Sequence, residues 1–329
     1  MNINSNYSLR NIEFYPKIKE FQYVGEDMGS YDIDTLFVGY FQGDYDWEVI
    51  EIDYDNPEMS VEINASLSMN LTPRMITNSF LKKFQTETYI TITENSREED
   101  KKSVYFLKPD VLMNAETTIF GRRILQQTLS IDILERKLTS KLGYKLEETL
   151  DNRYNEETAE KNIETWDAEL RILTFKNTNM ELHFDHVREE DSHYNSQIDL
   201  DQIEFDIQNR FSNDITLKSS VSYSYENGDD NTNDNQYSIS AFELEESASY
   251  FFKRKYRFFV KASYKRNYRD GSGFLSFLNE KKEGNIFKWD TNIDYKMSNY
   301  TSLNLQYSGN SYPDEKQVHK LSIEAKAEF

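Results

Sequence analysis

From about residue 60 to the end of the chain, apolar and polar residues alternate with a period of two. Between Ile215 and Tyr225, and again between Leu321 and Phe329, apolar residues take every second position or nearly so. Successive side chains of a β-strand point to opposite faces, so each such stretch has one apolar and one polar face. About ten of these stretches follow one another, each longer than the roughly 5–6 residues of an ordinary soluble strand. The pattern predicts an all-β, antiparallel fold.

The connections between these stretches are predicted to alternate in length. Short turns are expected near residues 135–137, 176–179, 209–214, 252–255 and 297–300, and longer polar connections near 151–163, 189–195, 226–236, 270–285 and 310–317. Eleven strands can be counted from Ile124 to the end of the chain. Three more are predicted at about 86–94, 103–109 and 112–120. The total is about 14 strands, within a range of 12 to 16.

The last strand ends on an aromatic residue, Phe329, and alternates Leu321, Ile323 and Ala325 with polar residues. This ending resembles the C-terminal signature of Gram-negative outer-membrane β-barrel proteins. Ala327 departs from the signature, because a large apolar side chain is common at that place. Over roughly residues 86–329, the resemblance implies an antiparallel up-and-down transmembrane β-barrel in the cell outer membrane. It also implies that Phe329 is an assembly signal for the barrel-assembly machinery.

The first sixty residues have a different character from the rest. A short pattern occurs twice, once at 24–32 and once at 38–46, with valine, glycine, tyrosine and aspartate at matching positions. We therefore expect two domains: residues 1–60 as a Gly/Tyr/Asp repeat segment, the end of a longer upstream region or a small β module, and residues 61–329 as the barrel. Residues 1–10 contain no apolar export segment. For an outer-membrane protein, which must be exported, we therefore expect either a signal peptide that is absent from this chain or a longer protein of which this chain is the C-terminal part.

Composition excludes several classes of function. The formal net charge of −20 argues against nucleic acid as a partner, since binding to DNA or RNA needs a basic surface. Without cysteine, the chain has no disulfide and no thiol nucleophile. The acidic balance suits a lumen that attracts cations, so we expect small solutes or cations, together with outer-membrane lipid, as partners.

Within the predicted strands, the alternation assigns side chains to two faces. Mid-strand apolar residues are predicted to face lipid, namely Leu217, Val221, Phe258, Val260, Ala262 and Ile323. Charged residues of the opposite parity are predicted to face the lumen, namely Glu169, Arg171, Lys218, Arg257, Lys261 and Lys265.

Candidate chemical sites are few. His183 and His186 are three positions apart on a predicted strand and should point to opposite faces, which is poor geometry for zinc. The acidic stretch 228–235 is interpreted as a solvated loop rather than a calcium site. Asp191, Ser192 and His193 are the nearest approach to a hydrolytic triad, but adjacent residues rarely meet as a catalytic pair. We therefore expect no enzymatic activity, no metal and no cofactor.

Three functions are compatible with these patterns. The favoured hypothesis is a porin-like outer-membrane barrel that acts as a pore, a transporter or a surface anchor. The alternative is a soluble or surface-exposed β-sheet module that binds a carbohydrate or protein ligand, with its apolar faces packed against each other in a sandwich. An envelope barrel hydrolase is a third. The exposure of the apolar faces discriminates between the first two, because a sandwich covers them and a barrel leaves them bare.

Overall fold

The computed structural model describes most of the chain. The described residues are 2–15, 17–25, 28–29, 31, 44–51, 57–73, 81–97, 101–108, 111–134, 137–153, 158–175, 177–192, 195–230, 235–253, 255–271, 282–298, 300–313 and 315–327. Phe329, His193, most of the second copy of the repeat and the centre of the acidic stretch 228–235 lie outside them.

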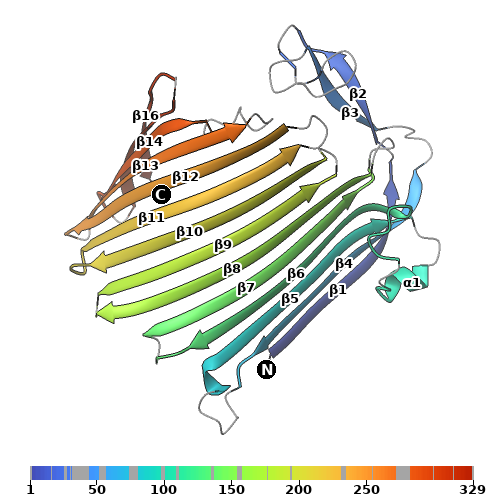
Figure 1. Ribbon diagram of the computed structural model, residues 1–329, viewed down its shortest axis with the longest axis horizontal. Coiled ribbons are helices and arrows are strands. Elements are labelled where there is room, and N and C mark those ends of the chain that lie inside the picture. The colour runs from blue at the N-terminus through green and yellow to red at the C-terminus, as the bar shows by residue number, and fades with distance from the viewer. Residues whose placement is uncertain are drawn as a thin grey trace.

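Fourteen strands of the described chain form one antiparallel sheet in sequence order (Figure 1). They are β1 (Asn2–Phe14), β4 (Glu58–Leu71), β5 (Phe84–Ser96), β6 (Thr118–Asp132), β7 (Leu138–Asp151), β8 (Ala159–Phe175), β9 (Thr178–Asp191), β10 (Ser196–Arg210), β11 (Ile215–Asp230), β12 (Asn235–Phe252), β13 (Tyr256–Gly271), β14 (Gly284–Lys296), β15 (Thr301–Ser311) and β16 (Val318–Ala327). The all-β, up-and-down antiparallel prediction and the count of 14 strands are confirmed.

Two of the fourteen strands, β1 and β4, are not among those that the sequence predicted, while β5 matches the strand predicted at 86–94. The prediction of a separate strand at 112–120 is wrong, since most of that range is a turn before β6 starts at Thr118. The strands from β6 to β16 match the predicted eleven, but β1 and β4 complete the sheet together with β5. The prediction of a strand at 103–109 is wrong, since the short helix α1 (Lys101–Tyr105) occupies part of that range. The predicted domain boundary at residues 60 and 61 falls inside β4, so the sheet begins well before it.

A separate two-stranded hairpin interrupts the sheet between β1 and β4. It pairs β2 (Lys17–Tyr23) with β3 (Tyr45–Glu51) and lies beyond one end of the large sheet (Figure 1). Tyr31 and Tyr45 from the two copies of the repeat form an isolated antiparallel bridge, and Gly25 adopts a positive φ of 122°. Only glycine adopts such a conformation readily, which accounts for the Gly at that turn.

The connections keep to two ends of the sheet, as predicted, but the hairpin strands at one end are longer than expected. Residues 226–236 were predicted to be a loop, yet β11 continues to Asp230 and β12 starts at Asn235, with Asp229 opposite Gln236. The backbone hydrogen bonds of this hairpin therefore continue past the apolar part of the sheet. We call the end of the sheet that carries the β11–β12 hairpin connection the long-loop end, and the opposite end the short-turn end.

The two edge strands of the sheet are β1 and β16, which are not paired with each other in the described chain. The sheet is strongly curved, with β1 on one side and β16 on the other (Figure 1). Each strand is antiparallel to its neighbour, so the first and the fourteenth strands run in opposite directions. This is the relation that an antiparallel seam between them would need.

A small hydrophobic core lies where α1 packs on the sheet. Val104 and Leu112 are buried against Val61 and Ile63 of β4. The hydroxyl of Tyr7 in β1 donates to the backbone carbonyl of Tyr105 at 3.1 Å. The segment between β5 and β6 therefore covers one corner of the apolar face.

Candidate functional site: the two faces of the sheet

Strand register defines two faces over the whole sheet, because residues paired across strands lie on the same face. Leu217 of β11 pairs with Ala248, which pairs with Val260 of β13. By this criterion all six residues predicted to face lipid share one face, the apolar face. All six predicted to face the lumen share the other, the polar face, where Lys218 pairs with Ser247, and Ser247 with Lys261. Lipid and lumen themselves remain predictions.

In an ordinary soluble sheet the apolar face is buried and the polar face is exposed to water. Here the apolar side chains are exposed, and some polar ones are buried. On the apolar face, Phe184, Ile203 and Val260 are 45%, 46% and 48% exposed. On the polar face, Asp206 and Ser220 are only 8% and 7% exposed. Exposed contiguous apolar patches beyond a few hundred Å² are rare on soluble monomers and mark contact with a membrane or a partner.

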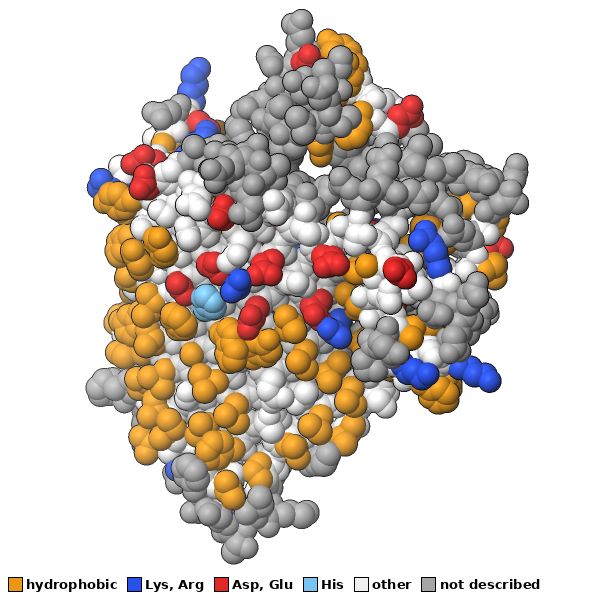
Figure 2. All heavy atoms as spheres, turned by 45° about the vertical axis from the view of Figure 1, so that its right-hand side comes forward, with side chains coloured by type: hydrophobic (Ala, Val, Ile, Leu, Met, Phe, Trp, Pro, Cys, Tyr) orange, Lys and Arg blue, Asp and Glu red, His pale blue; other side chains and the backbone are white. Residues whose placement is uncertain are grey.

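The apolar face forms a broad band that ends at polar residues. Figure 2 shows hydrophobic side chains gathered below a row of acidic and basic side chains and one histidine. On this face at the long-loop end, His186 Nδ1 lies 2.8 Å from Asp201 Oδ1. In β12 the band runs from Phe242 to Phe252. At about 3.4 Å per residue and a tilt of about 40°, that stretch rises roughly 26 Å, close to the apolar height of outer-membrane barrels.

Aromatic rings mark both ends of the band. Toward the long-loop end, the rings of Tyr144 and Trp166 have centroids 4.5 Å apart. At the short-turn end, Tyr256 and Tyr295 stack with centroids 4.4 Å apart, and Tyr250 lies 6.2 Å from Phe258. Two aromatic girdles that flank an apolar band are typical of transmembrane barrels.

A carboxylate interrupts the apolar band within β12. Glu246 of β12 shares that face, since it pairs with Ser219 and Ala262, and its side chain accepts a hydrogen bond of 2.7 Å from the Ser219 hydroxyl. The sequence analysis missed this residue, although its even number in the stretch Phe242–Phe252 gives it the parity of the apolar positions. An ionisable group on such a face is costly unless it has a partner.

The polar face contains a series of ion pairs between neighbouring strands. Lys218 Nζ lies 3.1 Å from Asp206 Oδ2, and Lys261 Nζ lies 2.7 Å from Glu245 Oε2. Three of the predicted lumen residues thus have acidic partners, since Arg171 Nε lies 3.1 Å from Glu181 Oε1. Because each of these basic side chains has an acidic partner on the neighbouring strand, charges of both signs occupy the polar face.

An acidic pair lies in the middle of the polar face. Asp167 of β8 is directly opposite Asp185 of β9, and Lys141 Nζ is 3.8 Å from Asp167. The Asp167 carboxylate lies over Gly143, where a Cβ atom would collide with it. Like charges directly opposite each other destabilise a sheet, and the Lys141 ammonium offsets part of this repulsion.

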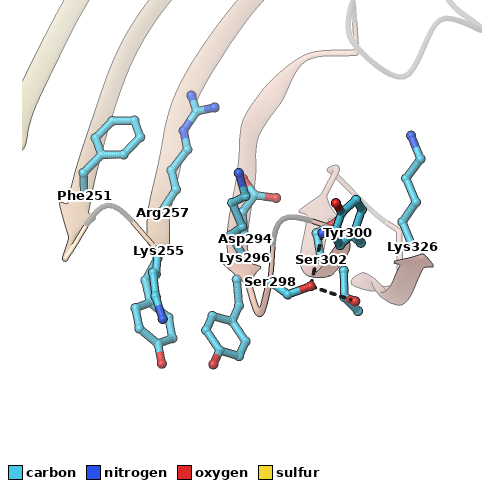
Figure 3. Close-up of a pocket in the computed structure, with 12 residues that line it drawn as sticks. Phe251, Lys255, Arg257, Asp294, Lys296, Ser298, Tyr300, Ser302 and Lys326 are labelled. Atoms are coloured by element: carbon cyan, nitrogen blue, oxygen red, sulfur yellow. Dashed lines mark hydrogen bonds between the residues drawn. The ribbon is translucent and has the colours of Figure 1, made fainter. Parts of the chain in front are cut away.

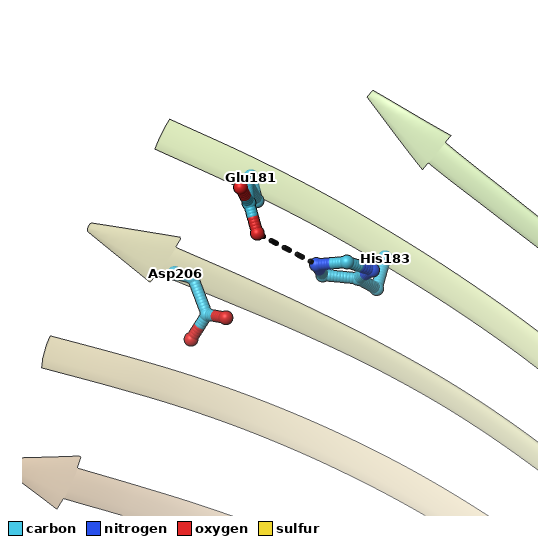
Figure 4. A group of neighbouring side chains, drawn as sticks. All are labelled: Glu181, His183 and Asp206. Atoms are coloured by element: carbon cyan, nitrogen blue, oxygen red, sulfur yellow. Dashed lines mark ion pairs between the residues drawn. The ribbon is translucent and has the colours of Figure 1, made fainter. Parts of the chain in front are cut away.

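Glu181, His183 and Asp206 form the group nearest to a metal site among the described residues (Figure 4). One atom from each lies within 4.8 Å of the others. Arg171 and Lys218 already neutralise the two carboxylates, so this group acts as part of the ion-pair series. His183 and His186 lie on opposite faces, as their spacing predicted.

The other candidates have structural roles where they are described. The Ser192 hydroxyl accepts a hydrogen bond of 2.7 Å from the backbone N–H of Glu160, which ties together the connections at the long-loop end. In the acidic stretch, the Tyr237 ring lies over Gly228 and its hydroxyl donates to Glu226 at 2.9 Å. Phe329 and His193 lie outside the described residues, so their predicted roles stay predictions.

Among the described residues, no helix is long and apolar enough to cross a membrane. Comparison of the sequence with protein-family models and with curated proteins gives no match.

Proposed function

We propose that this chain is an outer-membrane β-barrel whose apolar face contacts lipid and whose polar face lines a lumen. The observation that carries the proposal is the inverted exposure of the two faces. Burial of apolar side chains in lipid would supply the hydrophobic stabilisation that the small protein core leaves unrealised. The band height and the aromatic girdles support the same assignment.

Closure of the barrel requires a seam between β1 and β16. In the described part of the chain each of these strands has a strand partner on one side only, and an open sheet edge is a liability that barrels remove by closing on themselves. Their opposite directions permit an antiparallel seam of the kind that joins every other pair in the sheet. All described residues of β16 are exposed, which fits a strand that still lacks its second neighbour.

The sandwich alternative requires a second layer over the apolar face. In the described chain, the segment around α1 covers one corner of that face near β4. The middle of the face, on β9 to β13, carries exposed Leu182, Phe205 and Leu244. Lipid is therefore favoured over a packed second sheet.

For the activity, we propose a passive pore for small polar solutes with a preference for cations. Barrels of eight strands fill their interior with side chains, whereas those with 16–18 strands enclose a channel. A closed barrel of fourteen would leave an aqueous lumen narrower than that of the large porins. The Asp167–Asp185 pair has one basic neighbour among the described ion pairs, Lys141, so it adds net negative charge to the wall.

The decisive experiment is refolding of residues 1–329 into detergent micelles and, separately, into detergent-free buffer. A β-rich species that forms only in micelles and migrates faster on a gel when unheated would support the barrel. A monodisperse, cooperatively folding β-protein in plain buffer would refute it and favour the adhesion module.

A further inference from the structure

A cavity of about 380 Å³ opens at the short-turn end of the polar face (Figure 3). It lies between the β12–β13 turn and the β14–β15 turn and is bordered by β16. Phe251, Arg257 and Asp294 reach it from the polar face, since Arg257 pairs with both of the others across the strands. Its volume is within the range of small-molecule sites.

Basic side chains dominate the lining of this cavity. Lys255, Arg257, Lys296 and Lys326 contribute positive charge, and Asp294 is the one acidic residue among the described lining residues. The chain as a whole carries a net charge of −20, so this is a local reversal of sign.

Most of this positive charge is not neutralised by the protein. Within the described part of the chain, Lys255, Arg257 and Lys296 have no carboxylate within ion-pair distance, in contrast to Lys218 and Lys261 higher on the same face. The Arg257 guanidinium lies over the Phe251 ring at 5.5 Å, which leaves its N–H groups available to a ligand. An arginine held in this way presents a planar fork suited to phosphate or carboxylate.

Hydroxyl groups and aromatic rings complete the walls. Ser298 donates to the Thr301 hydroxyl at 3.1 Å and accepts a hydrogen bond of 3.1 Å from the backbone N–H of Tyr300 (Figure 3). Tyr300 also lines the cavity, whereas the stacked rings of Tyr256 and Tyr295 at its border belong to the apolar face. Hydroxyls and aromatic faces are the groups that contact a polar, hydroxylated body attached to an anionic head.

We propose that this cavity binds a small organic phosphate of sugar-phosphate size. The basic side chains hold the phosphate, and the hydroxyls of Ser298 and Thr301 and the Tyr300 ring contact the rest of the molecule. The site is built from β12 to β16 and their turns, so it exists whether or not the sheet closes and does not depend on the proposed membrane function.

The test is calorimetric titration of residues 1–329, folded in detergent micelles at physiological salt, with glucose 6-phosphate, inorganic phosphate and glucose. We expect glucose 6-phosphate to bind, phosphate to bind more weakly and glucose not to bind. The double variant R257Q/K296Q should lose at least tenfold in affinity. The control is Lys253→Gln, which removes one positive charge from the adjacent β12–β13 turn, outside the cavity.

Each result has a defined meaning. Absence of binding by the folded protein, or equal weakening by the double variant and the control, overturns the proposal. Equal binding of phosphate and glucose 6-phosphate overturns the assignment of the hydroxyls and Tyr300 as contacts for the sugar. Circular dichroism checks that each variant is folded, and K296R should retain binding if charge is what matters. If the micelle-folded protein migrates faster on a gel when unheated but binds no phosphate ester, this site is refuted while the barrel proposal is still supported.

Discussion

Val260 lies midway along β13 on the apolar face and is 48% exposed. Replacing it with arginine would place a charge near the middle of the bilayer, at a cost of about 2–4 kcal/mol. We expect Val260→Arg to lower by that amount the free energy of unfolding in phospholipid vesicles, measured by urea titration. Lys261→Arg is the control, because the adjacent side chain points to the polar face and keeps its charge. Equal stability of both variants in lipid would contradict the proposed orientation.

Glu246 gives the opposite prediction, because there the native residue is the unfavourable one. Its carboxylate lies on the apolar face with Ser219 as its hydrogen-bond partner. Glu246→Leu should raise the free energy of unfolding in vesicles by roughly 1 kcal/mol, since carboxylates on a lipid face cost less than basic groups. Glu245→Leu, one position away, should instead destabilise, because it leaves Lys261 without its partner. A loss of stability in the Glu246 variant would show that this face is not in lipid.

At the scale of elements, the seam between β1 and β16 can be tested by cross-linking, since the chain has no native cysteine. Asn6→Cys on the polar face of β1 is combined in turn with cysteine at Lys320, Ser322 or Glu324 of β16. In the micelle-folded protein one combination should form a disulfide in high yield. Asn6→Cys with Ile323→Cys pairs opposite faces and should not. If none of the three cross-links in protein that shows the heat shift, the seam is wrong.

The sequence predicted the strands in which apolar and polar residues alternate regularly. It did not predict the segments whose structure depends on packing or pairing with distant parts of the chain. Strands β6 to β16 alternate clearly and were counted correctly. Residues 103–109 carry a strand-like set of apolar residues, but Val104 packs against Val61 and Ile63 as part of a helical excursion. β1 alternates poorly, and its place is fixed by pairing with β4, a contact between distant parts of the chain that local patterns do not reveal.

For the whole molecule, the acidic pair predicts an electrical property of the lumen. The double variant D167N/D185N should lower the ratio of cation to anion permeability in planar bilayers by roughly 2–3-fold, because it removes two negative charges from the wall. The measurement is the reversal potential in a KCl gradient. The variant D201N removes one negative charge from the apolar face and should leave the ratio unchanged. A ratio unaffected by D167N/D185N would place the permeation path elsewhere.

The alternation of odd and even positions was enough to predict which residues share a face of the sheet. The six residues predicted to face lipid lie on one face, and the six predicted to face the lumen lie on the other. The sequence could not supply the partners across strands, because register depends on the exact length of each turn. The Lys218–Asp206 and Arg171–Glu181 pairs, the Asp167–Asp185 contact and the basic cavity all depend on register. They became visible only once the strands were aligned.

An even number of antiparallel strands also has a consequence for the outer ends of the sheet. β1 starts, and β16 finishes, at the short-turn end, since Ala327 pairs with Thr301 just after a short turn. Reporter proteins fused before Asn2 and after Ala327 would therefore be delivered to the same compartment. In the proposed outer-membrane barrel, an epitope inserted between β13 and β14 would be displayed in the opposite one, so we expect antibodies on intact cells to bind at the long-loop end.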